Sequence, residues 1–283
     1  MKSKIIEFFG SSTSSQQDWN AIVSEQKCPY ISKKCYKVRK SGPNISIGTC
    51  TVEYGKDPEP LVICPSRFLE RHQIFTDCIH LLTLHEPGNE LHVVSEVSIP
   101  GGSVDYFLIS AKNEKVVDFV GIEIQTLDTT GTVWPERQRL LKALNLKRLD
   151  DAESSTRPYG MNWKMTAKTI LVQIHHKIHT FEHLNKKLVL IVQDKLLEYM
   201  IKEFSFGHLS ASASLGESMH FHAYKLNSTL SKEHKLALDS RFSTDSEGIA
   251  KCLGLQAESK VELDLIIKTL QAKISLKTLL IPV

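Results

Sequence analysis

Two polar side chains interrupt an otherwise apolar segment, "VGIEIQTLDTTG", residues 120–131. Successive side chains of a β-strand point to opposite faces, so Glu123 and Gln125 would share one face. The neighbouring Ile122 and Ile124 would point to the other face. Two neighbouring polar groups are costly to bury unless they find partners. The segment therefore predicts either an edge strand with one solvated face or a metal-dependent site that uses both groups.

An acidic residue in the preceding segment, Asp105 in "SVDYFLI", gives this pair a chemical context. Residues 90–110 predict two strands joined by a Pro-Gly-Gly turn, and residues 115–126 predict a third. Neighbouring strands lie about 5 Å apart, so carboxylates on Asp105 and Glu123 could reach one ion. Hard carboxylate oxygens suit Mg²⁺, which can lower the pKa of a bound water enough to supply hydroxide.

The six cysteines are unevenly placed, five in the first third of the chain and one near its other end: Cys28, Cys35, Cys50, Cys64, Cys78 and Cys252. In a cytosolic protein, clustered cysteines are more often metal ligands than disulfides. The first four follow the pattern C-x6-C-x14-C-x13-C, which lacks the C-x2-C pairs of a zinc ribbon. Nearby Pro and Gly residues permit tight turns that aim backbone amides at sulfur. The pattern predicts either a four-thiolate metal site or a set of buried apolar cysteines.

The elements that must position these residues follow from periodicity and capping. Apolar residues at helical spacing predict helices, and short apolar runs predict strands, with a polar, turn-rich stretch at 128–162. The expected order after the cysteine segment is helix 66–85, strands within 90–110 and 115–126, helix 163–184, strand 186–192, helix 194–204, strand 218–226 and helix 259–275.

Composition sets the remaining bounds. The chain has 283 residues, of which 41% are apolar and 24% charged, and no run is long enough for a signal peptide or a membrane span. We therefore expect a soluble, cytoplasmic globular protein. Because the net charge is only +3, a polyanion would have to be met by bound cations or by the basic runs 33–40 and 136–148. Both runs could equally be solvated surfaces. The histidines at four-residue spacing after residue 174 and the pair at 220 and 222 indicate polar faces more readily than metal sites.

A strand Asp followed by an acidic-x-polar pair on the next strand resembles the PD-(D/E)XK nucleases, in which two carboxylates hold Mg²⁺ against the scissile phosphate. The third position of that motif is usually Lys, whereas this chain has Gln125. With this Gln, the segments "KCPYISKKCYKVRKS", "GTCTVEY", "ICPSRFLERHQIF", "GGSVDYFLI" and "EIQTLDTTG" together look like the NotI-type restriction endonucleases. The resemblance runs over about residues 5–200.

The resemblance implies a set of site residues. Asp105, Glu123 and Gln125 would be catalytic, with Asp105 and Glu123 binding magnesium and Gln125 orienting the attacking water. Glu70 and Glu96 are candidate accessory carboxylates, for which ordinary solvated side chains are the alternative. Because the family binds iron at a four-cysteine site, a structural iron (or zinc) is expected at Cys28, Cys35, Cys50 and Cys64.

The resemblance also implies an α/β fold with a mixed sheet flanked by helices. We expect a metal-binding segment at 1–65, a nuclease core at 66–205 and a C-terminal α/β extension at 206–283. The expected activity is that of a type II site-specific endonuclease on double-stranded DNA, acting as a homodimer with a cognate DNA methyltransferase as genetic partner. The alternatives are a repair nuclease of the same superfamily and a catalytically inactive DNA-binding module.

Overall fold

The computed structural model describes residues 3–39, 41–56, 58–146, 159–209, 213–229, 233–255, 267–268 and 271–272. The helix predicted at 259–275 lies almost entirely outside these residues and stays a prediction. No helix within the described ranges is long and apolar enough to cross a membrane.

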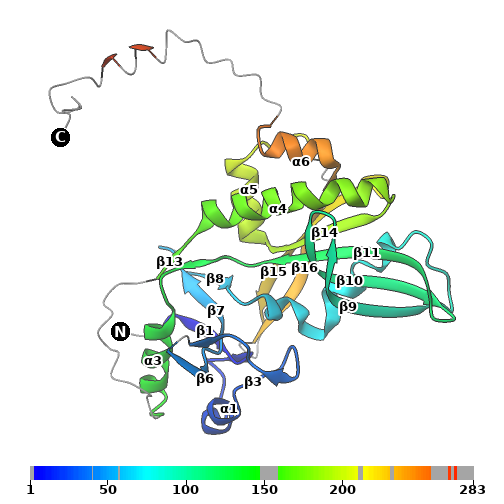
Figure 1. Ribbon diagram of the computed structural model, residues 1–283. Helices are drawn as coiled ribbons and strands as arrows, with labels where there is room; N and C mark the ends of the chain where they lie inside the picture. The colour runs from blue at the N-terminus through cyan, green and yellow to red at the C-terminus, as the bar shows by residue number, and fades with distance from the viewer. Residues whose placement is uncertain are drawn as a thin grey trace.

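A six-stranded mixed sheet organises the chain, in the order β16-β15-β14-β11-β10-β9 (Figure 1). Neighbours are antiparallel except at β11–β14 and β14–β15, which are parallel. The strands are β9 (Glu90–Ile99), β10 (Gly102–Lys112), β11 (Lys115–Gln125), β14 (Lys187–Gln193), β15 (Met219–Ser228) and β16 (His234–Thr244). The mixed α/β class, the 90–110 hairpin and the strands predicted within 115–126, 186–192 and 218–226 are confirmed. Strand β16 was not predicted.

Helices cover one face of this sheet. The helix predicted at 163–184 is α4 (Trp163–His183), and the helix predicted at 194–204 is α5 (Asp194–Glu203). Both pack on β14, and α4 also contacts the unpredicted α6 (Ser246–Cys252). Every residue of β14 is buried, which a strand covered on both faces requires.

The opposite face is covered by an irregular segment rather than by the single helix predicted at 66–85, and that prediction was wrong. The segment consists of the 3₁₀ turns η1 (Pro65–His72) and η2 (Ile79–Leu81) around the short helix α2 (Gln73–Thr76). Arg71 and His72 have φ of 52° and 56°, which interrupts helical geometry. Apolar residues of the segment still pack on the sheet, so their spacing reflected burial rather than a continuous helix.

The N-terminal region forms a second, four-stranded sheet, in the order β2-β1-β7-β8. Figure 1 shows it on the side of the molecule opposite α4, α5 and α6. Its elements and the small hairpins beside it are β1 (Ile5–Phe8), β2 (Ser11–Ser12), α1 (Trp19–Glu25), β3 (Lys27–Cys28), β4 (Lys33–Lys34), β5 (Val38–Arg39), β6 (Gly42–Ser46), β7 (Thr49–Tyr54) and β8 (Glu59–Val62). The four cysteines at positions 28, 35, 50 and 64 lie in these short strands or just after them.

The stretch 128–162, predicted as turns, contains a helix, α3 (Trp134–Ala143), and the small β12 (Thr129–Thr130) and β13 (Gly160–Met161) pair. The helix was missed because it buries polar residues. The guanidinium of Arg137 lies over the rings of Phe8 and Trp134 and its Nε donates to the carbonyl of Ile47. A buried arginine that lies on aromatic rings looks like a surface residue in a sequence.

A second buried arginine, Arg67, joins the two sheets. It is 1% exposed, and its Nε donates to Glu7 on β1 at 2.8 Å. Its Nη1 donates to Glu70 at 2.8 Å and its Nη2 to the carbonyl of His234 on β16 at 2.7 Å. A buried guanidinium is tolerated only with such full pairing. Arg67 therefore fixes the N-terminal sheet against both the 65–82 segment and the far edge of the central sheet.

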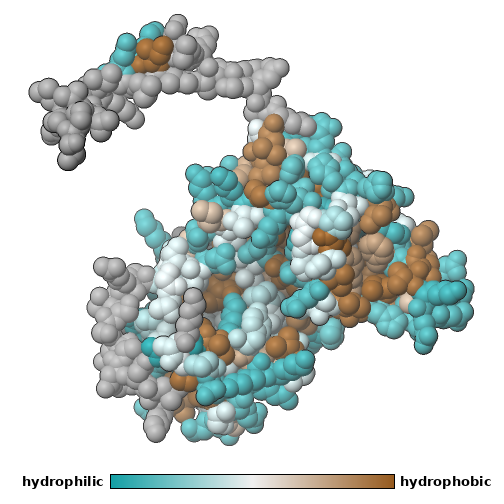
Figure 2. Space-filling model, viewed as in Figure 1, coloured by the Kyte–Doolittle hydropathy of each residue, from teal (hydrophilic) through white to brown (hydrophobic). Residues whose placement is uncertain are grey.

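Strand β9 forms the opposite edge of the central sheet and projects with β10 and β11 beyond the body of the molecule (Figure 1). Figure 2 shows apolar side chains along this projecting ribbon. Those exposed on it are Leu91, Val93, Val94 and Val116. Exposed apolar side chains on an unpaired edge favour association with another chain.

Two histidines on β15 are buried in uncharged form. His220 and His222 are 1% and 0% exposed, and Nδ1 of His222 lies 3.7 Å from the Sγ of Cys78. Burial lowers the pKa of His220 to about 4 and of His222 to about 3, and the nearby Arg241 acts in the same direction on both. Both side chains are therefore neutral in the folded protein near neutral pH.

We expect the free energy of unfolding to fall as the pH drops below about 6.5, because the unfolded chain then binds protons that the folded chain excludes. The stabilisation is fully present above that pH and is lost toward the folded-state pKa values. Each histidine contributes about 1.4 kcal/mol per pH unit in this window. Urea denaturation at pH 7.5, 6.0 and 5.0 measures the slope, which should become shallower in His222→Gln. An unchanged slope in that variant would contradict the assignment.

Candidate functional site

Asp105 and Glu123 lie side by side on adjacent strands. The β10–β11 register pairs Tyr106 with Ile122, and its continuation places Asp105 opposite Glu123 on the same face. The backbone amide of Ile124 donates to Oδ2 of Asp105 at 2.9 Å. Strand β11 is paired on both sides, so the interpretation of residues 120–131 as an edge strand is wrong. The two carboxylates are brought together as the sequence predicts.

A lysine that the sequence analysis did not select completes this cluster. Lys177 on α4 is 5% exposed, and its Nζ lies 2.6 Å from Oε1 of Glu123, which is itself 4% exposed. The signal was present in the sequence, since Lys177 falls in the apolar stripe of α4 between Ile174 and Phe181. A lysine within an apolar stripe indicates a buried partner.

Burial and neighbouring charges perturb the pKa values of both carboxyl groups. Burial raises the pKa of Glu123 to about 7; the Asp105 charge adds to this, while the hydrogen bond from Lys177 opposes it. Burial also raises the pKa of Asp105, against the opposing effects of the Ile124 amide and the Lys177 charge. Among the described residues, neither Oδ1 of Asp105 nor Oε2 of Glu123 has a hydrogen-bond partner. Each carboxylate thus keeps one oxygen available to a cation.

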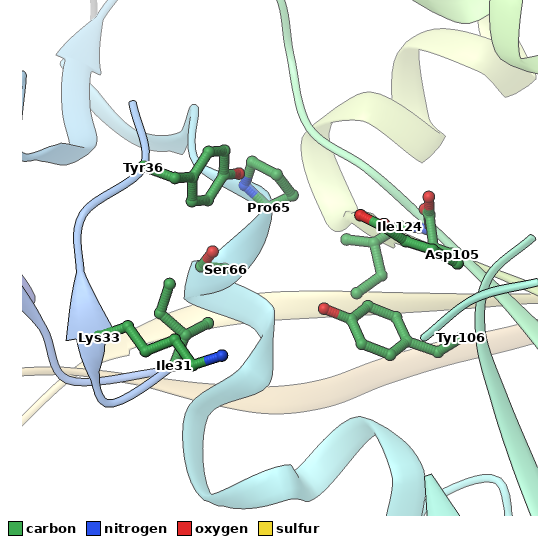
Figure 3. A pocket seen from close by; sticks show the side chains of 9 residues that line it. Ile31, Lys33, Tyr36, Pro65, Ser66, Asp105, Tyr106 and Ile124 are labelled. Carbon is green, nitrogen blue, oxygen red and sulfur yellow. Dashed lines mark hydrogen bonds between the residues drawn. The ribbon is translucent and has the colours of Figure 1, made fainter. Parts of the chain in front are cut away.

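A cavity of about 480 Å³ opens beside Asp105. Figure 3 shows its two walls, one from the cysteine-rich segment and the start of η1, the other from the ends of β10 and β11. The lining residues are Ile31, Lys33, Tyr36, Pro65, Ser66, Glu96, Asp105, Tyr106 and Ile124. The N-terminal region and the central sheet therefore share one cavity.

The two candidate accessory carboxylates differ in position. Glu96, exposed on β9, lines this cavity, and its charge contributes to the raised pKa of Asp105. It has a φ of 57°, so its backbone departs from regular strand geometry. Glu70 instead accepts hydrogen bonds from Arg67 and from the amide of Leu236 and lines a different cavity. The structure brings Glu96, but not Glu70, to Asp105.

Gln125 is the last residue of β11 and is half-buried. Its side-chain amide donates to the carbonyl of Thr126 at 2.6 Å. Alternation along the strand places it on the face of Glu123, one pair further toward the strand end. Its amide is therefore near the carboxylates but engaged with the backbone.

The four N-terminal cysteines are buried neighbours. The thiol of Cys50 donates to the carbonyl of Gly48 at 3.6 Å, and the interaction between the thiols of Cys50 and Cys64 lowers the pKa of Cys64 to about 6 and raises that of Cys50. Burial raises the pKa of Cys28 and Cys35, and both also feel the charge of Cys64. No group of three or more His, Cys, Asp or Glu side chains in the described part of the chain is arranged to hold a metal ion. The four-thiolate site expected from the sequence is therefore unconfirmed.

Backbone amides nevertheless converge on these sulfurs. Amides of Tyr30 and Ile31 donate to Cys28, and those of Lys37 and Gly48 donate to Cys35. The backbone amide of Gly10 is directed at the sulfur of Cys50, and that of Ser66 at the sulfur of Cys64. Amide donors of this kind stabilise thiolates, the form that binds metals. Four thiols that receive amide hydrogen bonds suit a thiolate-bound metal, although the four side chains are not arranged around a common point.

The two basic runs also differ. Lys33 and Lys34 are exposed, and Lys33 lines the cavity. In the second run, Arg137 is buried and Arg139 pairs with Glu136. Residues 147 and 148, the end of that run, lie outside the described part. The first run is thus the better placed of the two to meet a polyanion at the cavity.

Paired carboxylates at the end of a mixed sheet, with a lysine behind them and a basic wall in front, are typical of metal-dependent hydrolases. The family described as Restriction endonuclease NotI matches residues 22–215, and the chain belongs to this family. Membership implies a restriction endonuclease, a site-specific nuclease that binds DNA. No curated protein matches the chain.

Proposed function

We propose that the protein is a type II restriction endonuclease that hydrolyses phosphodiester bonds in double-stranded DNA at a specific site and requires Mg²⁺. The observation that carries this proposal is the juxtaposition of Asp105 and Glu123 in a chain of the NotI family. The core would be of the PD-(D/E)XK type, because its acids lie on the second and third strands of the meander.

Asp105 and Glu123 would hold the cation between their facing carboxylates. The cation would polarise the scissile phosphate and supply a nucleophilic hydroxide from bound water. Glu96, which lines the cavity with Asp105, would add negative charge beside the cation without being one of its ligands. The amide of Gln125 would orient the attacking water after leaving the carbonyl of Thr126. Gln carries no charge and cannot act as a base, so this role is limited to hydrogen bonding.

The DNA backbone would enter between the two cavity walls. Lys33 lines the cavity opposite Asp105, and an ammonium there can neutralise a phosphate. The phenol of Tyr36 lies on the same wall in Figure 3. Because this wall belongs to the cysteine-rich segment, the position of Lys33 depends on how the cysteines are held.

Cys28, Cys35, Cys50 and Cys64 would hold an iron or zinc ion with a structural role. Their burial and the amides directed at them support this assignment, and soft thiolates favour these metals over magnesium. The metal would fix the cavity wall and take no part in hydrolysis.

The active form would be a homodimer, since a palindromic site calls for two equivalent catalytic centres. The exposed apolar edge of the projecting ribbon gives the chain a surface suited to self-association. A cognate DNA methyltransferase would protect the host DNA. The alternatives are a repair nuclease of the same superfamily and a DNA-binding module that does not cleave.

Digestion of a defined genomic DNA separates these functions. We expect purified protein with Mg²⁺ to produce a discrete set of fragments and protein with EDTA to produce none. Nonspecific degradation would support the repair nuclease instead. Intact DNA in the presence of Mg²⁺, together with a gel shift, would support the inactive module.

A further inference from the structure

The carboxylate cluster contains one buried cation that the proposed function does not use. Lys177 approaches Glu123 from α4, and its charge also reaches Asp105, where it lowers a pKa that burial raises. Glu96, Asp105 and Glu123 carry three negative charges when ionised, and Lys177 carries one positive charge. The cluster is then left with two excess negative charges, which one divalent cation would neutralise.

The position of Lys177 is fixed by the hairpin turn between β9 and β10. The hydroxyl of Thr180 on α4 donates to the carbonyl of Pro100 at 3.0 Å. A Cβ on Gly101 would lie 2.2 Å from the carbonyl oxygen of His176, so the turn contacts the helix directly beside Lys177. Gly102 leaves room for the lysine stem, because a Cβ there would lie 3.2 Å from Lys177 Cε. The ammonium is therefore held at Glu123 by both the helix and the turn.

We propose that Lys177 is a positioning residue of the nuclease site, whose ammonium occupies Oε1 of Glu123 until a divalent cation replaces it there. While the cation is absent, Lys177 keeps Glu123 beside Asp105 and compensates its charge. Once replaced, the ammonium remains behind the carboxylates as the fixed positive charge that Gln125 cannot supply. The proposal rests on the proposed function, because it assigns Lys177 a part in the same site.

This role predicts opposite effects on cation binding and on cleavage. In Lys177→Met the stem is kept and the competing cation is lost, so we expect Ca²⁺ to bind about fivefold more tightly, since a like charge beside the site weakens binding. Cleavage with Mg²⁺ should fall at least about a hundredfold, the effect of removing a preorganised electrostatic group. Lys177→Arg keeps the charge, so its Ca²⁺ affinity should match the wild type and it should recover cleavage to within about tenfold. Lys177→Gln, which keeps a hydrogen-bond donor, should behave like Lys177→Met.

A matched control pair involves the strand that carries Glu123. Lys186 pairs with Asp118 of β11 at 2.6 Å and is also partly buried, but Asp118 stands five positions before Glu123 on that strand. Lys186→Met removes an equivalent ion pair and should lower thermal stability, with Ca²⁺ affinity and cleavage at wild-type levels. A difference between the two lysine variants thus reports position in the site and not the loss of a buried pair.

The experiment combines Ca²⁺ titration calorimetry at pH 8.5 with single-turnover cleavage and thermal unfolding of the full chain. Tighter Ca²⁺ binding with slower cleavage in Lys177→Met or Lys177→Gln supports the proposal. Weaker Ca²⁺ binding in these variants, cleavage at the wild-type rate, or a wild type that binds no Ca²⁺ overturns it. A wild type that binds Ca²⁺ but cleaves no DNA overturns the proposed function, and the Ca²⁺ affinities of the variants still decide whether Lys177 competes for Glu123.

Discussion

Asp105→Asn and Glu123→Gln are each expected to reduce Mg²⁺-dependent DNA cleavage by at least about a thousandfold, because each removes one charged ligand of the cation. Both substitutions keep side-chain volume. Replacement of Glu123 by Gln is preferable to replacement by Ala, because Gln keeps a hydrogen-bond acceptor for the Lys177 ammonium. Ala would leave that ammonium unpaired in the interior at a cost of about 3 kcal/mol, and a loss of folding could then be mistaken for a loss of activity. Single-turnover cleavage of a plasmid that carries one site measures the effect.

Two further measurements separate a loss of catalysis from a loss of DNA binding or of folding. Gel shifts in Ca²⁺ should detect DNA binding by both variants, because most of the contacts that hold DNA are made to phosphates by other groups. Asp118→Asn supplies the control, since Asp118 is a buried carboxylate on the same strand that pairs with Lys186 outside the cavity. Cleavage at wild-type rates by either site variant, or its equal loss in Asp118→Asn, would refute the assignment.

Cys50→Ser is expected to lower the iron or zinc content from about one atom per chain to none and to lower the melting temperature by roughly 10 °C. Cys50 is buried and its thiol interacts with that of Cys64, so its loss removes one of the four thiols proposed to bind the metal. Metal binding at such a site contributes directly to folding, and several kcal/mol correspond to a shift of this size in a protein of this length. Elemental analysis and differential scanning calorimetry measure the two effects.

Cys252→Ser is the matched control, because Cys252 is equally buried but lies on α6, outside the four-cysteine cluster. It should retain the full metal content. A wild-type protein without bound transition metal, or full metal content in Cys50→Ser, would rule out the metal site. The nuclease assignment does not depend on this result.

The sequence predicted the parts of the fold in which local pattern and burial agree. The 90–110 hairpin could be predicted because a Pro-Gly-Gly turn joins two strands with alternating apolar residues. Helix α4 could be predicted because its apolar stripe is long. It failed where tertiary contacts decide the outcome. The 66–85 segment follows a helical apolar pattern, yet Arg67 is drawn inward to Glu7 on a distant strand, and the backbone after it turns through two left-handed residues. Helix α3 was hidden because Arg137 is buried in it.

The same division applies to the site. Asp105 and Glu123 could be paired from the sequence because one hairpin turn fixes their register. Lys177 could not be assigned to them, since no local rule connects a residue on α4 with a strand residue 54 positions earlier. Glu70 is the reverse case, because the resemblance offered it as a candidate accessory carboxylate, whereas its carboxylate accepts hydrogen bonds from Arg67 and from the amide of Leu236 at a different cavity.

The contacts of Arg67 also limit the order in which the protein can fold during translation. Its partner His234 lies 167 residues further along the chain. A ribosome that adds about 10 residues per second needs roughly 17 s to cover that distance. During this interval the guanidinium has Glu7 and Glu70 available but lacks the carbonyl that completes its burial. The joint between the N-terminal sheet and β16 can therefore be completed only on a nearly finished chain, so a fragment that ends before β16 would lack one of the three partners of this buried guanidinium.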